Sequence, residues 1–232
     1  MNNCLILDGK EVALASSENL IVRVKKLHDF GRAPKLVAIL VGDDPASTTY
    51  VNMKERACHT LGIKTEIKRL SKDTTTSELK ELIFDLNNDT KVDGILLQHP
   101  VPNHIDEIAC FNAIDLKKDV DGVTTQGFGN MSMGMGAFGS CTPLGIMRIL
   151  DYYKIDVNGM NALVIGRSQI LGKPMAAMLL NANATVTIAH SKTKNLTDSL
   201  KNYDLVVVAV GVPKFVSACL LYTSPSPRDG LL

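Results

Sequence analysis

Short apolar runs of strand length alternate with helical patterns along this chain, and that alternation restricts the fold more than any other feature of the sequence. The clearest run, Leu36–Val41, is apolar at every position, as expected for a strand buried on both faces. Gly42 ends this run, and Asp44 and Pro45 then suit the N-cap and the first residue of a helix. Strands that alternate with helices in this way indicate an α/β protein.

The same alternation extends over the rest of the chain. Thr75–Glu78 has the pattern of a capping box, which predicts a helix reaching about Asn87. Further strands are expected at residues 63–70, 94–98, 162–165, 185–189 and 205–209, and further helices at residues 45–61, 143–153, 171–180 and 196–201. Residues 119–141 are rich in Gly and Met and lack clean periodicity, so we expect this stretch to join two domains.

We therefore predict two α/β domains, residues 1–121 and residues 122–216, with the active site in the cleft between them. The second domain reads as βαβαβ, which predicts a Rossmann-type fold, but a full Rossmann sheet has about six strands. After Val216 the chain becomes rich in Ser and Pro, which cannot continue a buried parallel sheet. We expect an incomplete Rossmann domain followed by a non-native tail, residues 217–232; a genuine flexible tail is the alternative.

Charge and cysteine content exclude several classes of protein. Lys and Arg number 25 against 24 Asp and Glu, so the net charge of +1 gives no reason to expect a nucleic-acid or membrane surface. Apolar runs stay far below the ~20 residues of a membrane span. The five cysteines are scattered without a C-x-x-C pair, as expected for free thiols in the cytoplasm, and no cluster has metal-ligand spacing.

The second domain contains a candidate phosphate-binding loop. Gly166 directly follows a predicted strand, and Gly172 stands at the start of the next helix, where backbone N–H groups attract a pyrophosphate. A glycine-rich turn without a ligand is the alternative. The next strand ends in His190-Ser191-Lys192, where an NAD enzyme usually has a carboxylate. Arg167 and Ser191 could instead bind a 2′-phosphate, which favours NADP, although Arg167 could also be a solvated surface charge.

The first domain contains candidate catalytic side chains. Tyr50 and Lys54 stand at i and i+4 of the predicted helix and so share one face. Gln98 ends a predicted strand, where ligands of α/β proteins usually bind. Lys118–Gly122 is a charged turn. On spacing alone, Tyr50 and Lys54 could equally be an exposed amphipathic pair, and the charged turn a solvated loop.

Taken together, these fragments resemble the bifunctional methylenetetrahydrofolate dehydrogenase/methenyltetrahydrofolate cyclohydrolase family. The resemblance runs from about residue 5 to about residue 216, and its motifs follow in the family's order. They are Gly42-Asp-Asp-Pro-Ala-Ser-Thr-Thr-Tyr-Val-Asn-Met-Lys54, Gly94-Ile-Leu-Leu-Gln-His-Pro-Val-Pro102, Lys118-Asp-Val-Asp-Gly122, Cys141-Thr-Pro-Leu-Gly145 and Gly166-Arg-Ser-Gln-Ile-Leu-Gly172. The sequence departs from the family at Ser140 (usually Pro), His99 (commonly Leu), Thr124 and Gly127 (often His and Asn).

The resemblance implies NADP-dependent oxidation of methylenetetrahydrofolate to the methenyl form and hydrolysis of that product to formyltetrahydrofolate. It implies that Tyr50 stacks on the folate rings, Asp121 hydrogen-bonds the pyrimidine edge, and Gln98 positions Lys54, the central catalytic residue. Ser47 belongs to the same signature, as a substrate-binding residue. The implied cofactor-binding residues are Gly166, Arg167, Ser168, Gly172 and Ser191.

The resemblance also implies a homodimer, and a further NADP-contacting segment and a helix beyond the point where this chain diverges. Hydrolysis needs a proton acceptor, and we expect partial removal of water around Lys54 to favour its neutral amine. Two alternatives are a dehydrogenase of related two-domain fold acting on an amino acid, and a truncated, non-catalytic folate- or nucleotide-binding module.

Overall fold

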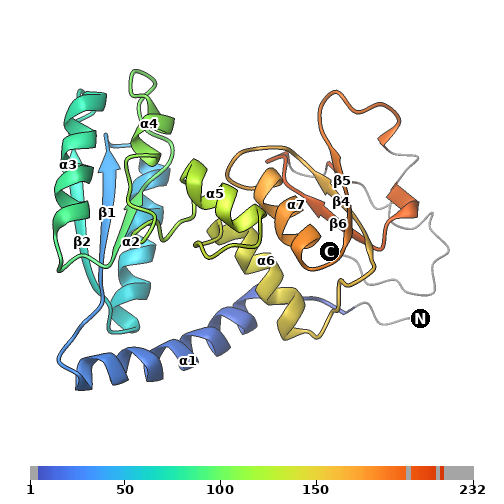
Figure 1. Ribbon diagram of the computed structural model, residues 1–232, viewed down its shortest axis with the longest axis horizontal. Helices are drawn as coiled ribbons and strands as arrows, with labels where there is room; N and C mark the ends of the chain where they lie inside the picture. Colours follow the sequence, from blue (N-terminus) through green and yellow to red (C-terminus); the bar gives the residue numbers. More distant parts are fainter. Residues whose placement is uncertain (1–4, 197–199, 213–214, 217–232) are drawn as a thin grey trace. The chain divides into compact units, whose positions relative to one another are not determined.

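The computed structural model describes residues 5–196, 200–212 and 215–216, and the chain forms two compact units (Figure 1). The N-terminal unit comprises Ala13–Asn130 and Gly136–Gly139, and the C-terminal unit comprises Met1–Val12, Met131–Met135 and Ser140–Leu232. Helix α1 (Gly9–Asp29) begins in the C-terminal unit and continues into the N-terminal unit. Each unit contains its own parallel sheet, which confirms the predicted two-domain α/β fold.

The N-terminal unit is a three-stranded sheet with helices on both faces. Its strands are β1 (Lys35–Val41), β2 (Lys64–Leu70) and β3 (Gly94–Leu97), in the order β2-β1-β3. Its other helices are α2 (Pro45–Thr60), α3 (Thr76–Asn88), α4 (Glu107–Phe111) and α5 (Thr125–Ser132), of which the last two residues of α5 belong to the C-terminal unit. Alternate residues of β1 point to opposite faces. Val37 and Ile39 therefore pack with α3 and α4, whereas Ala38 and Leu40 pack with Val51 of α2.

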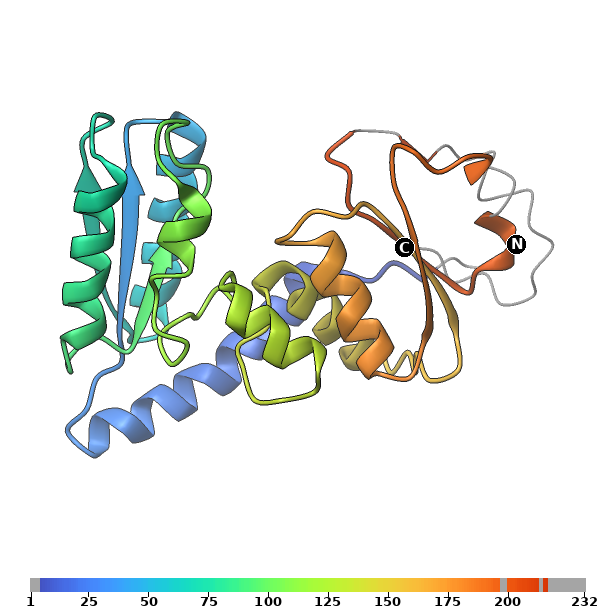
Figure 2. The same ribbon diagram turned by 45° about the horizontal axis from the view of Figure 1, so that its top comes forward.

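The C-terminal unit repeats this arrangement with different elements (Figure 2). Its strands are β4 (Asn161–Ile165), β5 (Thr185–Ala189) and β6 (Leu205–Val208), in the order β5-β4-β6 and all parallel. Helices α6 (Cys141–Tyr152) and α7 (Gly172–Asn181) supply Leu150, Met175 and Leu179 to one face, where they pack with Ala162 and Val164. The short 3-10 helix Leu200–Asn202 contributes Leu200 to the opposite face.

Local sequence signals placed most helix ends correctly. Thr75 and Glu78 form the predicted capping box, in which each side chain accepts a hydrogen bond from the other residue's backbone N–H. Pro45 starts α2 behind its N-cap Asp44, and Gly62 follows the helix with φ +77°. Helix α6 begins earlier than expected, at Cys141 rather than Pro143.

Three helices were not predicted. Helix α1 buries only Val12 and Val24 along its length and therefore shows no apolar stripe in the sequence. Helix α5 lies in the Gly- and Met-rich stretch, and Thr124 caps it by accepting a hydrogen bond from Gly127 N at 2.9 Å. Helix α4 is a single short turn.

Some expectations fall on residues that are not described. The predicted helix at residues 196–201 includes 197–199, and the proposed tail at residues 217–232 lies entirely outside the described residues. Within the described part of the chain, no helix is both long and apolar enough to cross a membrane.

Candidate active site

The carboxyl ends of β1 and β3 form the natural ligand-binding edge of the N-terminal unit. The two strands are paired in parallel, and Gln98 N extends the pairing by donating to Ile39 O at 2.9 Å. After β1 the chain enters α2 on one face, and after β3 it leads to α4 on the other. Such a point, where successive connections leave on opposite faces, is where open parallel sheets bind ligands.

Lys54 and Gln98 meet at this edge. Lys54 Nζ donates to Gln98 Oε1 at 3.2 Å, and Gln98 Nε2 donates to the carbonyl of His99 at 2.7 Å. A carbonyl only accepts and an amine N–H donates, so these two partners together fix which end of the Gln98 amide faces Lys54. Tyr50 lies one helical turn before Lys54 and is 59% exposed, which leaves its ring available to a ligand.

Ser47 lies in the first turn of α2, and its side chain is buried. The side chain of Asp44 accepts a hydrogen bond from Ser47 N at 2.7 Å, and this bond lowers the pKa of Asp44. Ser47 is only 3% exposed and Val51, one turn later, is fully buried. The structure therefore places Ser47 at the anchored start of α2 and does not bring it to the surface beside Tyr50.

The two aspartates of the Lys118–Gly122 turn have different surroundings, which the sequence did not indicate. Asp119 is 1% exposed, and its carboxylate accepts hydrogen bonds from Val123 N at 3.1 Å and Thr124 N at 3.0 Å. Lys118 Nζ donates to two backbone carbonyls at the end of α3. Asp121 is only half-buried. Lys118 and Asp119 thus hold the turn, and the Asp121 side chain remains partly exposed.

The same turn is fastened to β3. Ile95 N donates to Lys118 O at 2.8 Å, and Ile95 and Asp119 form a parallel bridge. A Cβ on Gly94 would lie 2.6 Å from the Val120 side chain, so glycine is required at that position. A search of the sequence for Asp-x-Asp turns would find the motif, but only the fold separates the buried carboxylate from the half-buried one.

In the C-terminal unit, the loop from Gly166 to Gly172 passes so close to other backbone segments that side chains would not fit at its two glycines. Gly166 has φ +127°, and a Cβ there would lie 2.4 Å from Ala209 O. A Cβ on Gly172 would lie 2.3 Å from Gly166 O. The Ser168 hydroxyl accepts from Gly172 N at 3.2 Å and the Ser168 carbonyl accepts from Lys173 N at 3.0 Å. Glycine-lined backbone at the N-terminus of α7 is a form suited to a pyrophosphate.

Arg167 and Ser191 follow neighbouring strands at the same edge. Gly166 N donates to Ala189 O at 2.8 Å, which joins the ends of β4 and β5. Both side chains are exposed. The turn after β5 closes on itself, because Lys192 N donates to His190 Nδ1 at 3.1 Å. The stretch His190–Lys194 carries no carboxylate that would repel a 2′-phosphate.

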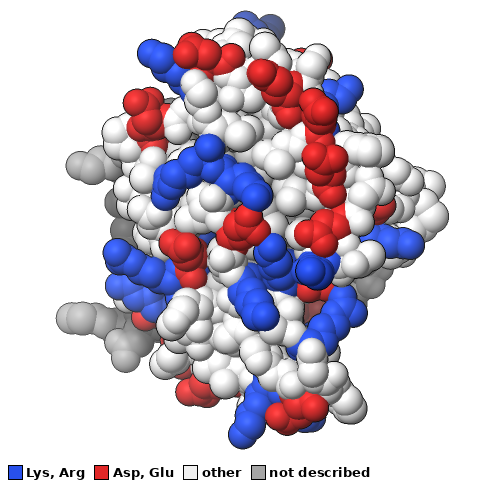
Figure 3. Space-filling model, turned by 90° about the vertical axis from the view of Figure 1, so that its left-hand side faces the viewer, with Lys and Arg blue, Asp and Glu red and all other residues white. Residues whose placement is uncertain are grey.

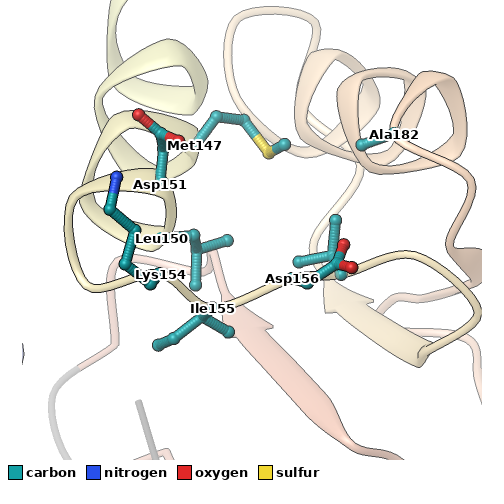
Figure 4. Close-up of a pocket in the computed structure, with 8 residues that line it drawn as sticks. Met147, Leu150, Asp151, Lys154, Ile155, Asp156 and Ala182 are labelled. Carbon is teal, nitrogen blue, oxygen red and sulfur yellow. The ribbon is translucent and has the colours of Figure 1, made fainter.

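The pocket in Figure 4 lies away from these residues. It has a volume of about 370 Å³ and is lined by Met147, Leu150, Asp151, Lys154, Ile155, Asp156, Val157 and Ala182. These residues lie where the chain approaches the start of β4, whereas Gly166 follows its end. Parallel sheets bind ligands at the carboxyl ends of their strands, which is where Gly166 lies and this pocket does not. Among the described residues, no group of three or more His, Cys, Asp or Glu is arranged to hold a metal ion.

Comparison with known proteins links both units to one enzyme family. Residues 7–121 match the tetrahydrofolate dehydrogenase/cyclohydrolase catalytic domain, and residues 140–224 match the NAD(P)-binding domain of the same enzymes. The bifunctional protein FolD of Teredinibacter turnerae is 57% identical over 217 residues, covering 93% of this chain and 78% of that protein.

Solved structures agree with these matches. The crystal structure of the bifunctional FolD methylenetetrahydrofolate dehydrogenase/cyclohydrolase from Campylobacter jejuni is 42% identical with a TM-score of 0.92, over 94% of this chain and 77% of that one. The Trypanosoma brucei methylenetetrahydrofolate dehydrogenase-cyclohydrolase, solved with NADP and an inhibitor, is 31% identical with a TM-score of 0.87, over 92% of this chain and 74% of that one.

Proposed function

This chain belongs to the tetrahydrofolate dehydrogenase/cyclohydrolase family, and from that premise we propose that Tyr50, Lys54, Gln98 and Asp121 form its folate site. The protein is an NADP-dependent methylenetetrahydrofolate dehydrogenase and a methenyltetrahydrofolate cyclohydrolase of one-carbon metabolism. The family matches extend over both units and decide against a dehydrogenase acting on an amino acid.

The Lys54–Gln98 hydrogen bond is the observation that carries the assignment. Hydrolysis adds water to the methenyl cation and releases formyltetrahydrofolate and one proton, so a nearby group must take that proton. Lys54 in its neutral form can do so, while the Gln98 carbonyl, at 3.2 Å, holds one of its N–H bonds and so orients the amine. Oxidation needs no such acceptor, because hydride is the group transferred.

Tyr50 and Asp121 supply binding and orientation in this proposal. The exposed ring of Tyr50 offers a flat surface on which a pterin ring can stack. Asp121 offers a carboxylate that can accept hydrogen bonds from the amino and ring N–H groups of a pyrimidine edge. Asp119 has its carboxylate already engaged by two backbone N–H groups, which supports assigning the ligand contact to Asp121. The substrate role of Ser47 stays a prediction.

NADP is the cofactor, and when bound it accepts the hydride. The C-terminal unit fits this dinucleotide, since Gly166 and Gly172 leave backbone open where side chains would intrude. We assign the pyrophosphate to the loop that Ser168 holds closed and the 2′-phosphate to Arg167 and Ser191, which follow adjacent strands.

We also propose that the protein is a cytoplasmic homodimer that binds neither nucleic acid nor membranes. Among the described residues, Cys58 and Cys110 are free thiols, as in reducing compartments. The face in Figure 3 carries interspersed positive and negative side chains without a broad field of either sign. The dimer rests on the family resemblance, and light scattering after size-exclusion chromatography would test it.

Replacing Lys54 by Met tests the proposed site. The substitution keeps length and apolar bulk and removes the amine, so methenyl hydrolysis should fall by about 10²–10⁴-fold, the usual contribution of a general acid–base group. Folate binding should largely survive, and dehydrogenase activity should fall less. Lys80→Met, at an exposed position on α3, is the matched control and should leave both activities unchanged. Near-normal hydrolysis by the Lys54 variant would remove Lys54 from the mechanism.

A further inference from the structure

The loop between β3 and α4 controls how Gln98 is presented to Lys54. The carbonyl of His99 accepts from Gln98 Nε2 at 2.7 Å and therefore directs the amide oxygen towards Lys54. The position of this carbonyl depends on the path of the backbone from Gln98 to Val101. Whatever holds that backbone also holds the acceptor that orients the amine of Lys54.

Glu107 is the side chain that holds this backbone. Its Oε1 accepts from the ring Nδ1 of His99 at 2.7 Å and from the backbone N–H of Val101 at 3.1 Å. One carboxylate oxygen thereby joins two points of the loop, on either side of Pro100. No motif in the sequence predicts this contact, because Glu107 lies nine residues beyond Gln98 and belongs to none of the recognised patterns.

The carboxylate stands on a fixed base. Glu107 is the first residue of α4, whose N-cap Asp106 accepts from Ala109 N at 3.0 Å. Asp106 N in turn donates to Thr76 Oγ1 at 2.9 Å, which ties the start of α4 to the start of α3. Cys110 and Phe111 of α4 are buried in the core. Glu107 therefore holds the loop from a helix that is anchored in the hydrophobic core.

We propose that Glu107 is a positioning residue for the cyclohydrolase reaction, acting through His99 and Val101 on Gln98 and through Gln98 on Lys54. This inference rests on the proposed roles of Lys54 and Gln98. The side chains of His99 and Glu107 are 48% and 26% exposed, and ion pairs so exposed add little to stability. The contact therefore matters for the geometry of the reaction more than for folding.

The chemistry explains why a small shift would be costly. If the His99 carbonyl moves away, the Gln98 amide loses the partner that distinguishes its two orientations. In the reversed orientation its NH₂ group faces Lys54 and donates to the free electron pair of the neutral amine, the pair that must take the proton. The amine then loses the acceptor that sets the direction of its free electron pair, while Tyr50 and Asp121, which lie on other elements, continue to bind the folate.

Glu107→Ala, compared with Glu107→Gln, tests the proposal. Because a misplacement of about 1 Å can cost up to ~10²-fold in rate, we expect kcat for methenyl hydrolysis to fall roughly tenfold in the Ala variant. KM should change less than about twofold, since binding groups are untouched. The Gln variant keeps an oxygen for Val101 N–H and should recover a good part of kcat. Glu81→Ala, exposed on α3, is the control and should leave kcat unchanged.

A double-mutant cycle separates positioning from a general structural role. In a Gln98→Ala background, Glu107→Ala should lower kcat by less than about twofold, because the residue through which it acts is gone. Equal losses in both backgrounds, or a loss that only follows a lower melting temperature, would overturn the proposal. A large effect of Lys54→Met with none from Glu107→Ala would defeat this inference alone, whereas no effect of Lys54→Met defeats the proposed site.

Discussion

The two units use one strand arrangement for opposite purposes. In each, the first strand in sequence lies in the middle of a parallel three-stranded sheet, with the second on one side and the third on the other. In the N-terminal unit, side chains meet at the carboxyl edge, and we propose that two of them, Lys54 and Gln98, carry the chemistry. In the C-terminal unit, backbone brought close by Gly166 and Gly172 forms the corresponding edge.

This contrast shows that a shared topology fixes where a ligand binds but not what binds it. A transferred proton needs a titratable side chain, which can be changed without disturbing the fold. A pyrophosphate is bound well by backbone N–H groups, which exist only if the chain passes close enough. Substitutions should therefore damage activity alone in the first case, and fold and binding together in the second.

Gly172→Ala should have the largest effect of the substitutions considered, because it should destabilise the C-terminal unit and abolish NADP binding. The new Cβ would lie 2.3 Å from Gly166 O and 2.7 Å from Arg167 N, and these are backbone atoms that cannot rotate away. We expect a loss of about 3 kcal/mol or more in the free energy of unfolding, at the upper end for overpacking, together with loss of NADP binding. Denaturant unfolding and a calorimetric NADP titration would measure both.

Gly145→Ala is the control for this change. Gly145 lies inside α6, and a Cβ there would meet nothing within 4 Å. Replacing a helical glycine by alanine should then leave stability equal or raise it by up to ~1 kcal/mol. Equal destabilisation by the two substitutions would mean that the close approach at Gly172 is not what constrains this unit.

The aspartate pair in the N-terminal unit sharpens the comparison. Asp119→Ala would leave two backbone N–H groups without their acceptor, so we expect a loss of about 2 kcal/mol in stability. Asp121→Ala should leave stability nearly unchanged and weaken folate binding. Unfolding curves and folate titrations of both variants would show whether structure and binding are divided in this way. A result in which Asp121 proves the more destabilising would reverse the assignment.

A smaller effect is expected on the affinity for the cofactor. If Arg167 binds the 2′-phosphate, Arg167→Ala should lower NADP affinity by about tenfold, or ~1.4 kcal/mol, and leave the weaker NAD affinity unchanged. Arg148→Ala, an exposed arginine on α6, serves as the control. Parallel calorimetric titrations with the two dinucleotides would provide the ratio. Comparable affinities of the unaltered protein for NAD and NADP would count against the assigned site.

The smallest effect is electrostatic and lies outside both sites. Glu66 on β2 pairs with Lys35 at 2.6 Å and with Lys68, and these partners lower its pKa from 4.5 to about 2. A lowered pKa in the folded state adds stability above pH 4.5 that is lost as the pH falls towards 2. Because the pair is exposed, Glu66→Gln should cost only a few tenths of a kcal/mol at pH 7. Urea unfolding at pH 7 and pH 3 should show the difference shrinking at the lower pH.

The sequence predicted those features that depend on residues close together in the chain, such as the starts of helices and the ends of strands. Asp44, Pro45 and the Thr75–Glu78 box mark helix starts through their own side chains, and Gln98 was identified by its position at a strand end. Helix α1 was not predicted because it buries so few residues. Apolar residues such as Leu14 and Val22 are exposed, so its apolar positions do not mark a single buried face.

What the sequence could not supply are contacts made only after folding. Asp119 and Asp121 are equivalent in the sequence, and burial alone separates them. The link from Glu107 to Val101 depends on the path of a loop, which no residue pattern describes. Side-chain identity therefore predicts the candidate residues, while the contacts around them can be described only from the fold.

The contact of Gly166 with both Ala209 and Gly172 also bears on how this enzyme could change over time or be redesigned. Gly166 approaches the backbone of Ala209, 43 residues further along the chain, and Gly172 approaches the backbone of Gly166, so neither glycine can take a side chain unless the backbone facing it moves. Single substitutions at these glycines should therefore not be tolerated. Transfer of the Gly166–Gly172 loop alone into another protein should also fail, because the facing backbone would be missing. The turn at Ser191 is free of that linkage, because its backbone bonds stay within residues 190–193. Substitutions in that turn are therefore the easiest way to change the preference between NADP and NAD, while the Gly166–Gly172 loop stays unchanged.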